Sequence, residues 1–291
     1  MPSINVRNLP DELHDRISRS AVRSERSLEA EVRYTLAAAY PNRSGLSLKQ
    51  EWMQATAERL HALVEQLKAD GFWRNLGKGT PVQLAAVIGE ETPARMLGWM
   101  DGTEPLSYEG ASRISAFTGC SQEWLISGDD SMFAYTLMDD DYKDFFLPDS
   151  SETFRFHLIR PDTSTGFGQV PLLVIREAFS YGKQRAELAY FGDHFHLSDG
   201  MGGGGNFKLK RFLQFLKRHS SVLKLSAYIL DIDYHEPGSH HPRYYLNKIR
   251  EHESPWLDRM LKGEAPAWLT EFNAHLDEVK NTPVESVEEG E

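Results

Sequence analysis

The stretch PSINVRNLP, residues 2–10, decides how the N-terminal part of this chain is interpreted. Polar and apolar residues alternate from Ser3 to Arg7, which is typical of a half-buried β-strand. Pro10 ends this run, and no second strand-like segment follows for more than a hundred residues. The backbone groups of the strand therefore need a partner from elsewhere, and the same strand of a second chain can provide them.

Two short helices are predicted after the strand. Pro10 is followed by two acidic residues, a typical helix start, and Leu13, Ile17 and Ala21 then recur at helical spacing. Ser27 is the predicted N-cap of a second helix, whose buried face is marked by Leu28, Val32, Leu36 and Ala39. A core made by one strand and two helices is marginal at this size, so a symmetric dimer is expected.

The order of these elements resembles the ribbon-helix-helix family of Arc- and MetJ-type repressors. The resemblance rests on SINVRNLPDEL, a helix, a turn with Arg26-Ser27, and then LEAEVRYTL. It implies that a ribbon from two chains enters the major groove of DNA and that Ser3, Asn5 and Arg7 contact base edges. These side chains suit the role because asparagine can pair with adenine, arginine with guanine, and serine with either base.

The same resemblance implies a phosphate contact at the start of the second helix, made by Arg26, Ser27 and Leu28. The alternative is an edge strand that packs on another domain and leaves its polar face in water. The charge favours the DNA-binding interpretation: residues 1–47 carry seven arginines against six acidic residues, whereas residues 48–130 carry seven basic against twelve acidic residues. The first segment is thus the one least repelled by phosphate.

The middle of the chain is predicted to be helical. Residues 48–69 form a long amphipathic pattern, and residues 82–128 resemble the Cro/C1-type helix-turn-helix family. The resemblance implies a recognition helix from Thr92 to about Asp101, with Thr92 and Arg95 as a possible second DNA contact. Glu90-Glu91 in the turn would oppose binding to phosphate, and Gly98 is expected to face outward without a side chain. A helical module for protein contacts is the alternative.

The last part of the chain has the pattern of a mixed α/β domain. Strands are predicted at residues 154–159, 170–175, 187–190 and 223–231, and helices at 207–218, 244–252, 256–261 and 268–279. The glycine run 202–205 is interpreted as a flexible connector, and residues 281–291 as a disordered acidic tail. Several side chains of the types that bind metals lie close to one another in the sequence. They could bind a divalent metal only if the fold brings them together. They are the pairs His194 and His196, Asp231 and Asp233, and His240 and His241, with His235 nearby.

The composition limits the remaining options. A net charge of −11 argues against a chain that coats nucleic acid indiscriminately, and the single cysteine, Cys120, is interpreted as a core residue. No apolar run is long enough to suggest a membrane span, so a cytoplasmic protein without a membrane partner is expected.

The sequence therefore predicts a multidomain protein: ribbon-helix-helix (residues 1–45), then an all-α helix-turn-helix module (46–130), then a mixed α/β domain (131–280) before the tail. The hypothesis is a sequence-specific repressor that binds double-stranded DNA as a homodimer or a higher homo-oligomer, without cofactor, metal or catalytic residues. One alternative is an antitoxin-like protein whose C-terminal domain binds a partner protein. The other is a metal-dependent enzyme domain fused to DNA-binding modules.

Overall fold

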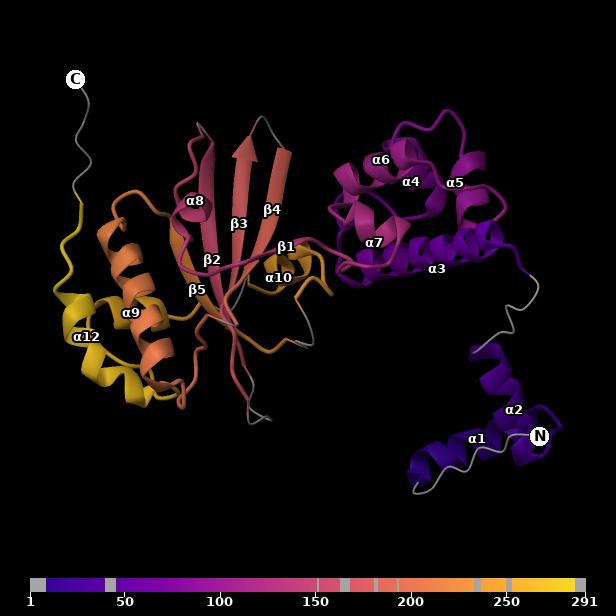
Figure 1. The fold of residues 1–291 in the computed structure, drawn as a ribbon, viewed down its shortest axis with the longest axis horizontal. Coiled ribbons are helices and arrows are strands. Elements are labelled where there is room, and N and C mark those ends of the chain that lie inside the picture. Colours follow the sequence, from indigo (N-terminus) through magenta and orange to yellow (C-terminus); the bar gives the residue numbers. More distant parts are fainter. Residues whose placement is uncertain are drawn as a thin grey trace. The chain divides into compact units, whose positions relative to one another are not determined.

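The computed structural model describes residues 9–39, 46–150, 152–162, 168–180, 183–192, 194–232, 237–249 and 253–285. The chain divides into two compact units, residues 1–52 and residues 53–291 (Figure 1). The second unit contains the helical middle segment from Met53 on and the α/β segment. The domain boundaries drawn from the sequence at residues 45 and 130 stay predictions.

The first unit contains the two predicted helices, α1 (Asp11–Arg23) and α2 (Leu28–Ala39). Acidic residues occupy the first turn of each helix, where they interact favourably with the positive end of the helix dipole. Ser27 is the N-cap of α2, as predicted, because its Oγ accepts a hydrogen bond from the N–H of Ala30 at 3.2 Å. The predicted strand from Ser3 to Arg7 lies outside the described residues.

The helical segment consists of α3 (Leu48–Ala69), α4 (Pro81–Val87), α5 (Ala94–Met100), α6 (Tyr108–Thr118) and α7 (Gln122–Ile126). Helix α3 has the buried side that the amphipathic pattern of residues 48–69 predicts, with Leu60, Leu63, Val64 and Leu67 buried. Cys120 is buried as expected, and this burial raises the pKa of its thiol to about 11. The thiol is therefore a core group and not a reactive one.

A five-stranded sheet organises the rest of the second unit. The strands are β1 (Tyr135–Leu137), β2 (Thr153–Pro161), β3 (Leu173–Ser180), β4 (Lys183–Tyr190) and β5 (Leu225–Leu230), in the order β1-β4-β3-β2-β5. Strands β2, β3 and β4 pair antiparallel, while β1 pairs with β4 and β5 pairs with β2 in parallel. The predicted mixed α/β region is thus confirmed, although its short edge strand β1 carries no sequence pattern that predicts it.

Helices cover both faces of this sheet. The remaining helices are α8 (Lys143–Phe146), α9 (Gly202–Arg218), α10 (Pro242–Lys248), α11 (Trp256–Leu261) and α12 (Asn273–Lys280), with a 3₁₀ turn, η2 (Thr270–Phe272), before α12. In Figure 1, α9 and α12 lie on one side of the sheet and α10 on the other. One core joins α9, α11 and α12 to the face of β2 that carries Phe156 and Leu158, and a second core places Tyr245 of α10 against Ile159 and Ile175.

The start of α9 corrects one expectation. The glycine run 202–205 is the first turn of a 17-residue helix, not a flexible connector. Glycine is a poor helix former, but α9 buries Leu209, Phe212 and Leu216 against the sheet, and this packing can extend the helix into a segment of low propensity.

Candidate nucleic-acid interface

The turn between α1 and α2 sets the direction in which α2 begins. The N–H of Arg26 donates to the carbonyl oxygen of Ala21 at 2.9 Å, and the N–H of Glu25 donates to that of Val22 at 3.2 Å. This pair of bonds is a Schellman motif, which ends α1 and needs a left-handed residue. Glu25 occupies that position with φ of +52°. The motif places Arg26 and Ser27 directly before the first turn of α2.

The first turn of α2 offers backbone N–H groups that the helix itself does not use. The N–H of Ala30 donates to the Ser27 side chain. The N–H groups of Leu28 and Glu29 lie too early in α2 to reach a carbonyl oxygen of a preceding helical turn, and the first such bond is made by Glu31. Together with the helix dipole, such amides favour an anion such as phosphate. Ser27 and Leu28 are exposed, so the described geometry is compatible with the predicted phosphate contact, which itself stays a prediction.

Arg26 has an internal partner. Its guanidinium donates to Oε2 of Glu31 at 2.9 Å and lies 3.8 Å from the centre of the Tyr34 ring. The hydroxyl of Ser20 donates to the other oxygen of Glu31 at 2.7 Å. The hydrogen bonds from Ser20 and Arg26 lower the pKa of Glu31 and keep this covered carboxylate charged. Arg26 can therefore contact a phosphate only through those guanidinium N–H groups that do not bond to Glu31.

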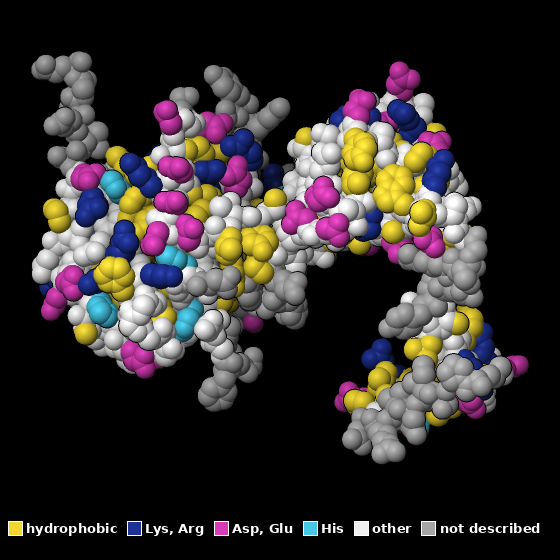
Figure 2. Space-filling view, in the orientation of Figure 1, with side chains coloured by type: hydrophobic (Ala, Val, Ile, Leu, Met, Phe, Trp, Pro, Cys, Tyr) yellow, Lys and Arg dark blue, Asp and Glu magenta, His cyan; other side chains and the backbone are white. Residues whose placement is uncertain are grey.

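The apolar faces of α1 and α2 are open to solvent in a single chain. Leu13, Leu28 and Leu36 are 39%, 39% and 41% exposed, and Ala21 is the only apolar side chain fully buried among residues 9–39. Figure 2 accordingly shows hydrophobic side chains at the surface of the first unit. Residues at core-type spacing that remain accessible indicate a missing partner surface.

The segment predicted as a helix-turn-helix has a small exposed reading surface. Only Ala94, Arg95 and Leu97 of α5 are exposed, and Thr92 lies exposed just before the helix. The expectation for Gly98 is wrong: this residue is buried, and a Cβ added to it would lie 2.9 Å from Cγ of Glu104. Gly98 therefore allows a close approach of the Glu104 side chain inside the module.

Glu90 is not a free acid in the turn before α5. Its side chain is 3% exposed, forms an ion pair with Arg113 of α6, and lies 3.8 Å from a guanidinium nitrogen of Arg95. The positive charges of Arg113 and Arg95 offset part of the repulsion that Glu90 would exert on a phosphate. Arg95, the predicted DNA contact, therefore already lies close to a carboxylate of its own chain. The exposed Glu91 still carries a negative charge next to α5.

The metal-binding types of side chain in the α/β segment contact different partners and do not form one cluster among the described residues. Nε2 of His194 lies 3.4 Å from a carboxylate oxygen of Asp140, and the Ser198 hydroxyl lies 2.8 Å from Nδ1 of His196. His240 and His241 instead contact Asp70 at the end of α3. Within the described part of the chain, no three His, Cys, Asp or Glu side chains gather around a possible metal ion. Asp233 and His235 lie outside that part.

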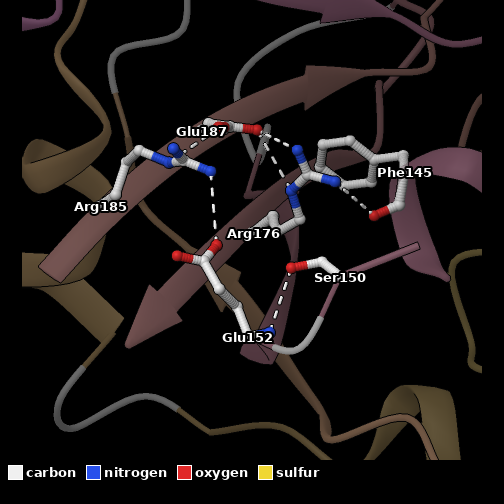
Figure 3. Close-up of polar contacts among 6 residues, drawn as sticks. All are labelled: Phe145, Ser150, Glu152, Arg176, Arg185 and Glu187. Carbon is white, nitrogen blue, oxygen red and sulfur yellow. Dashed lines mark hydrogen bonds and ion pairs between the residues drawn. The ribbon is translucent and has the colours of Figure 1, made fainter. Parts of the chain in front are cut away.

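A polar network on β3 and β4 also pairs its cations internally (Figure 3). Arg176 donates to Glu187 and to the carbonyl oxygen of Phe145, the latter at 2.9 Å. Nε of Arg185 lies 3.2 Å from Glu187, and another of its nitrogens lies 3.6 Å from Glu152. Because both arginines have carboxylate partners, this network links the neighbouring strands β3 and β4 and is not a candidate binding site for an anion.

Comparison with known proteins assigns a class to the N-terminal segment. Residues 2–40 match the family described as Antitoxin FitA-like, ribbon-helix-helix. The N-terminal region is therefore ribbon-helix-helix-like, in agreement with α1, α2 and the turn between them. The match covers a small part of the 291 residues and assigns no role to the helical or α/β segments. No curated protein and no solved structure matches this chain.

Sequence reasoning missed two features. Arg16, Arg19 and Arg23 share one face of α1, a pattern visible in their spacing of three and four residues. The contact of Asp70 with His240 joins residues 170 positions apart, and no local pattern could have indicated it.

A search of the described helices for a membrane-spanning segment finds none with the required length and apolar character.

Proposed function

We propose that this protein is a dimeric regulator that binds a specific DNA sequence through a ribbon formed by residues 3–7 of two chains. The carrying observation is the ribbon-helix-helix match over residues 2–40, which coincides with the two described helices of the first unit. Proteins of this architecture dimerise and place the paired ribbon in the major groove. The base-contacting residues are then Ser3, Asn5 and Arg7, and the sites are palindromic or repeated, as expected of a repressor.

The open apolar faces of α1 and α2 support the dimer. Leu13 and Leu36 lie at core positions but are about two-fifths exposed in one chain, so a second copy would bury them. The amides of Leu28 and Glu29, which precede the first hydrogen bond within α2, support the phosphate contact that orients such a dimer on DNA. Arg26 contributes to this contact less directly than the sequence suggests, because it pairs with Glu31.

The test is the selection of a preferred duplex by the full chain from a random pool, followed by titration of that duplex and a scrambled one. Arg7→Ala should reduce the preference between the two duplexes by about 1–3 kcal/mol, the discrimination carried by one bidentate arginine contact. Arg33→Ala is the matched control, because Arg33 is already paired with Glu29. A preference that survives Arg7→Ala unchanged would exclude the ribbon contact.

An antitoxin role is the second candidate. It is favoured by the description of the matched family, and the acidic residues 131–291, with eighteen basic against twenty-five acidic side chains, would suit a basic partner protein. Expression of the tagged chain in its native cells should then recover a stoichiometric partner. Recovery of that partner by a chain truncated after residue 130 would place the partner contact outside the α/β segment.

For the helical segment we propose a protein contact and not a second DNA reader. The support is the small exposed surface of α5 and the pairing of Arg95 with Glu90. Arg95→Ala should accordingly leave the length of the DNA footprint unchanged. A shorter footprint would establish Arg95 as a second DNA contact.

A further inference from the structure

Three arginines form a positive face on α1. Arg16, Arg19 and Arg23 follow one another at spacings of three and four residues, so they lie on one side of the helix. All three are exposed, and with Ser20 they line an open hollow of about 270 Å³. From Arg16 to Arg23 the helix rises by about 10 Å, so the three charges form a short row.

The other two described arginines of this unit each have a carboxylate partner within the chain. Arg26 pairs with Glu31, and Arg33 pairs with Glu29. By contrast, none of the three arginines on α1 forms an ion pair with a described carboxylate; Arg19 only donates to the backbone oxygen of Asp15 at 3.3 Å.

Two acids lie next to this side of α1, both in the first half of the helix. Glu12 lies one turn before Arg16, in the first turn, where the dipole already stabilises its charge, and Asp15 lies one turn before Arg19. The net positive charge therefore lies on the second half of α1. Because the face consists of arginines, it presents planar donor groups that match phosphate oxygens two at a time.

We propose that this arginine face binds the phosphate backbone of the DNA duplex that the ribbon reads. This inference rests on the proposed function, but concerns residues that the ribbon-helix-helix resemblance does not assign. It is supported by proximity along the chain: three residues separate Arg7 from Asp11, the start of α1, so their Cα atoms are at most about 14 Å apart, and Arg16 follows about 8 Å further along the helix. The face therefore follows the predicted base-contacting strand closely.

Charge also favours DNA as the occupant. Double-stranded DNA carries one negative charge per about 1.7 Å of its axis, so a row of about 10 Å meets several phosphates. The rest of the chain is acidic, with twelve acidic against seven basic residues over positions 48–130, and would not itself attract DNA. The arginine face would hence supply affinity without base specificity, while Ser3, Asn5 and Arg7 supply specificity.

The experiment measures the dissociation constant of the full chain for a selected and a scrambled duplex over a series of salt concentrations. Each arginine that contacts a phosphate contributes about 0.9 to the slope of log Kd against log salt. Because the DNA-bound form is a dimer, Arg16→Gln, Arg19→Gln and Arg23→Gln each remove two arginines and should each lower this slope by up to about 1.8. The triple variant removes six arginines and should lower it by up to about 5. The ratio of the two dissociation constants should stay unchanged.

Two controls make the result specific. Arg33→Gln removes a cation of the same unit that is already paired, and it should leave the slope unchanged. Replacing the three residues by lysine keeps the charge on α1 and should restore most of the slope. Circular dichroism of each variant checks that α1 and α2 remain folded.

The outcomes separate this inference from the proposed function. If the wild-type chain does not distinguish the two duplexes, sequence-specific binding fails, whereas the slope on either duplex still tests the arginine face. An unchanged slope in the folded triple variant would overturn the inference even if specificity holds. Loss of a copurified protein partner, without a change in slope, would also overturn it and assign the face to an acidic protein surface.

Discussion

Asp70 lies 2.7 Å from Nδ1 of His240, and this contact joins the end of α3 to the segment before α10. The other carboxylate oxygen of Asp70 accepts the backbone N–H of His241 at 2.7 Å, and its carbonyl oxygen accepts a hydrogen bond from Asn247 at 2.9 Å. Asp70 is 2% exposed, so these bonds are shielded from water. They attach the helical segment to the α/β segment within the second unit.

Replacing Asp70 by alanine should weaken this attachment. The N–H of His241 would lose its acceptor in a buried position, which costs about 1–3 kcal/mol of the free energy of unfolding. Urea denaturation of the full chain measures the change. Glu65→Ala is the matched control on the same helix, because Glu65 forms an exposed pair with Lys68, and such pairs contribute about 0–1 kcal/mol. Equal effects of the two substitutions would contradict the structural role of Asp70.

His241 should make the second unit sensitive to acid. Burial, together with the nearby charge of Arg243, lowers the pKa of His241 from 6.5 to about 3, and Nδ1 accepts the N–H of Arg243 at 2.9 Å. The imidazole is therefore neutral in the folded protein and takes up a proton first in the unfolded chain. Stability is thus fully present above pH 6.5 and falls below it, by up to about 1.4 kcal/mol per pH unit until pH reaches about 3.

The measurement compares the urea midpoint of the wild type and of His241→Asn at pH 7, 6 and 5. Asparagine can keep the cap on α10, because its side chain accepts the same backbone bond, but it does not titrate. The variant should be less stable at pH 7, since it loses the ring contacts with Phe72 and Phe133, and its midpoint should change less between pH 6 and 5. The same pH dependence in both proteins would rule His241 out as the titrating group.

Glu25→Gly should stabilise the first unit. Glu25 holds φ of +52°, a conformation that costs a residue with a side chain about 1 kcal/mol and that glycine adopts freely. The variant should slow hydrogen exchange of the amides of α1 and α2 in the full chain. The neighbouring Ser24→Gly is the control, because Ser24 has φ of −96° and gains no relief. Faster exchange in Glu25→Gly would mean that its carboxylate has a role that the backbone geometry does not reveal.

Much of the first unit could be predicted because its signals are local. Ser27 marks the cap of α2 in the sequence, and Leu13, Ile17 and Ala21 set the face of α1, so both helices lie where the pattern places them. The partner of Arg26 was not predictable in the same way. Glu31 is five residues further on, but its inward orientation depends on Ser20 of the preceding helix.

Later parts of the chain depend more on tertiary contacts. The direction of Gly98 was predicted wrongly, because a helical repeat gives spacing but does not show that Glu104 lies over this residue. The strand β1 has three residues at the sheet edge, too few for an alternating pattern, and is held by its pairing with β4. Base contacts by Ser3, Asn5 and Arg7 lie outside the described residues and stay a prediction.

Leu36→Glu should dissociate the dimer. In a single chain Leu36 is 41% exposed, so a charge at this position costs the isolated unit little. In the proposed dimer the same side chain would be buried, and an unpaired carboxylate is strongly unfavourable there. Ala38→Glu adds the same charge to an exposed position on the other side of α2 and serves as the control. Sedimentation of the full chain should give a monomer for Leu36→Glu and a dimer for Ala38→Glu. Dimers of equal stability for both would show that the apolar face of α2 is not the contact between copies.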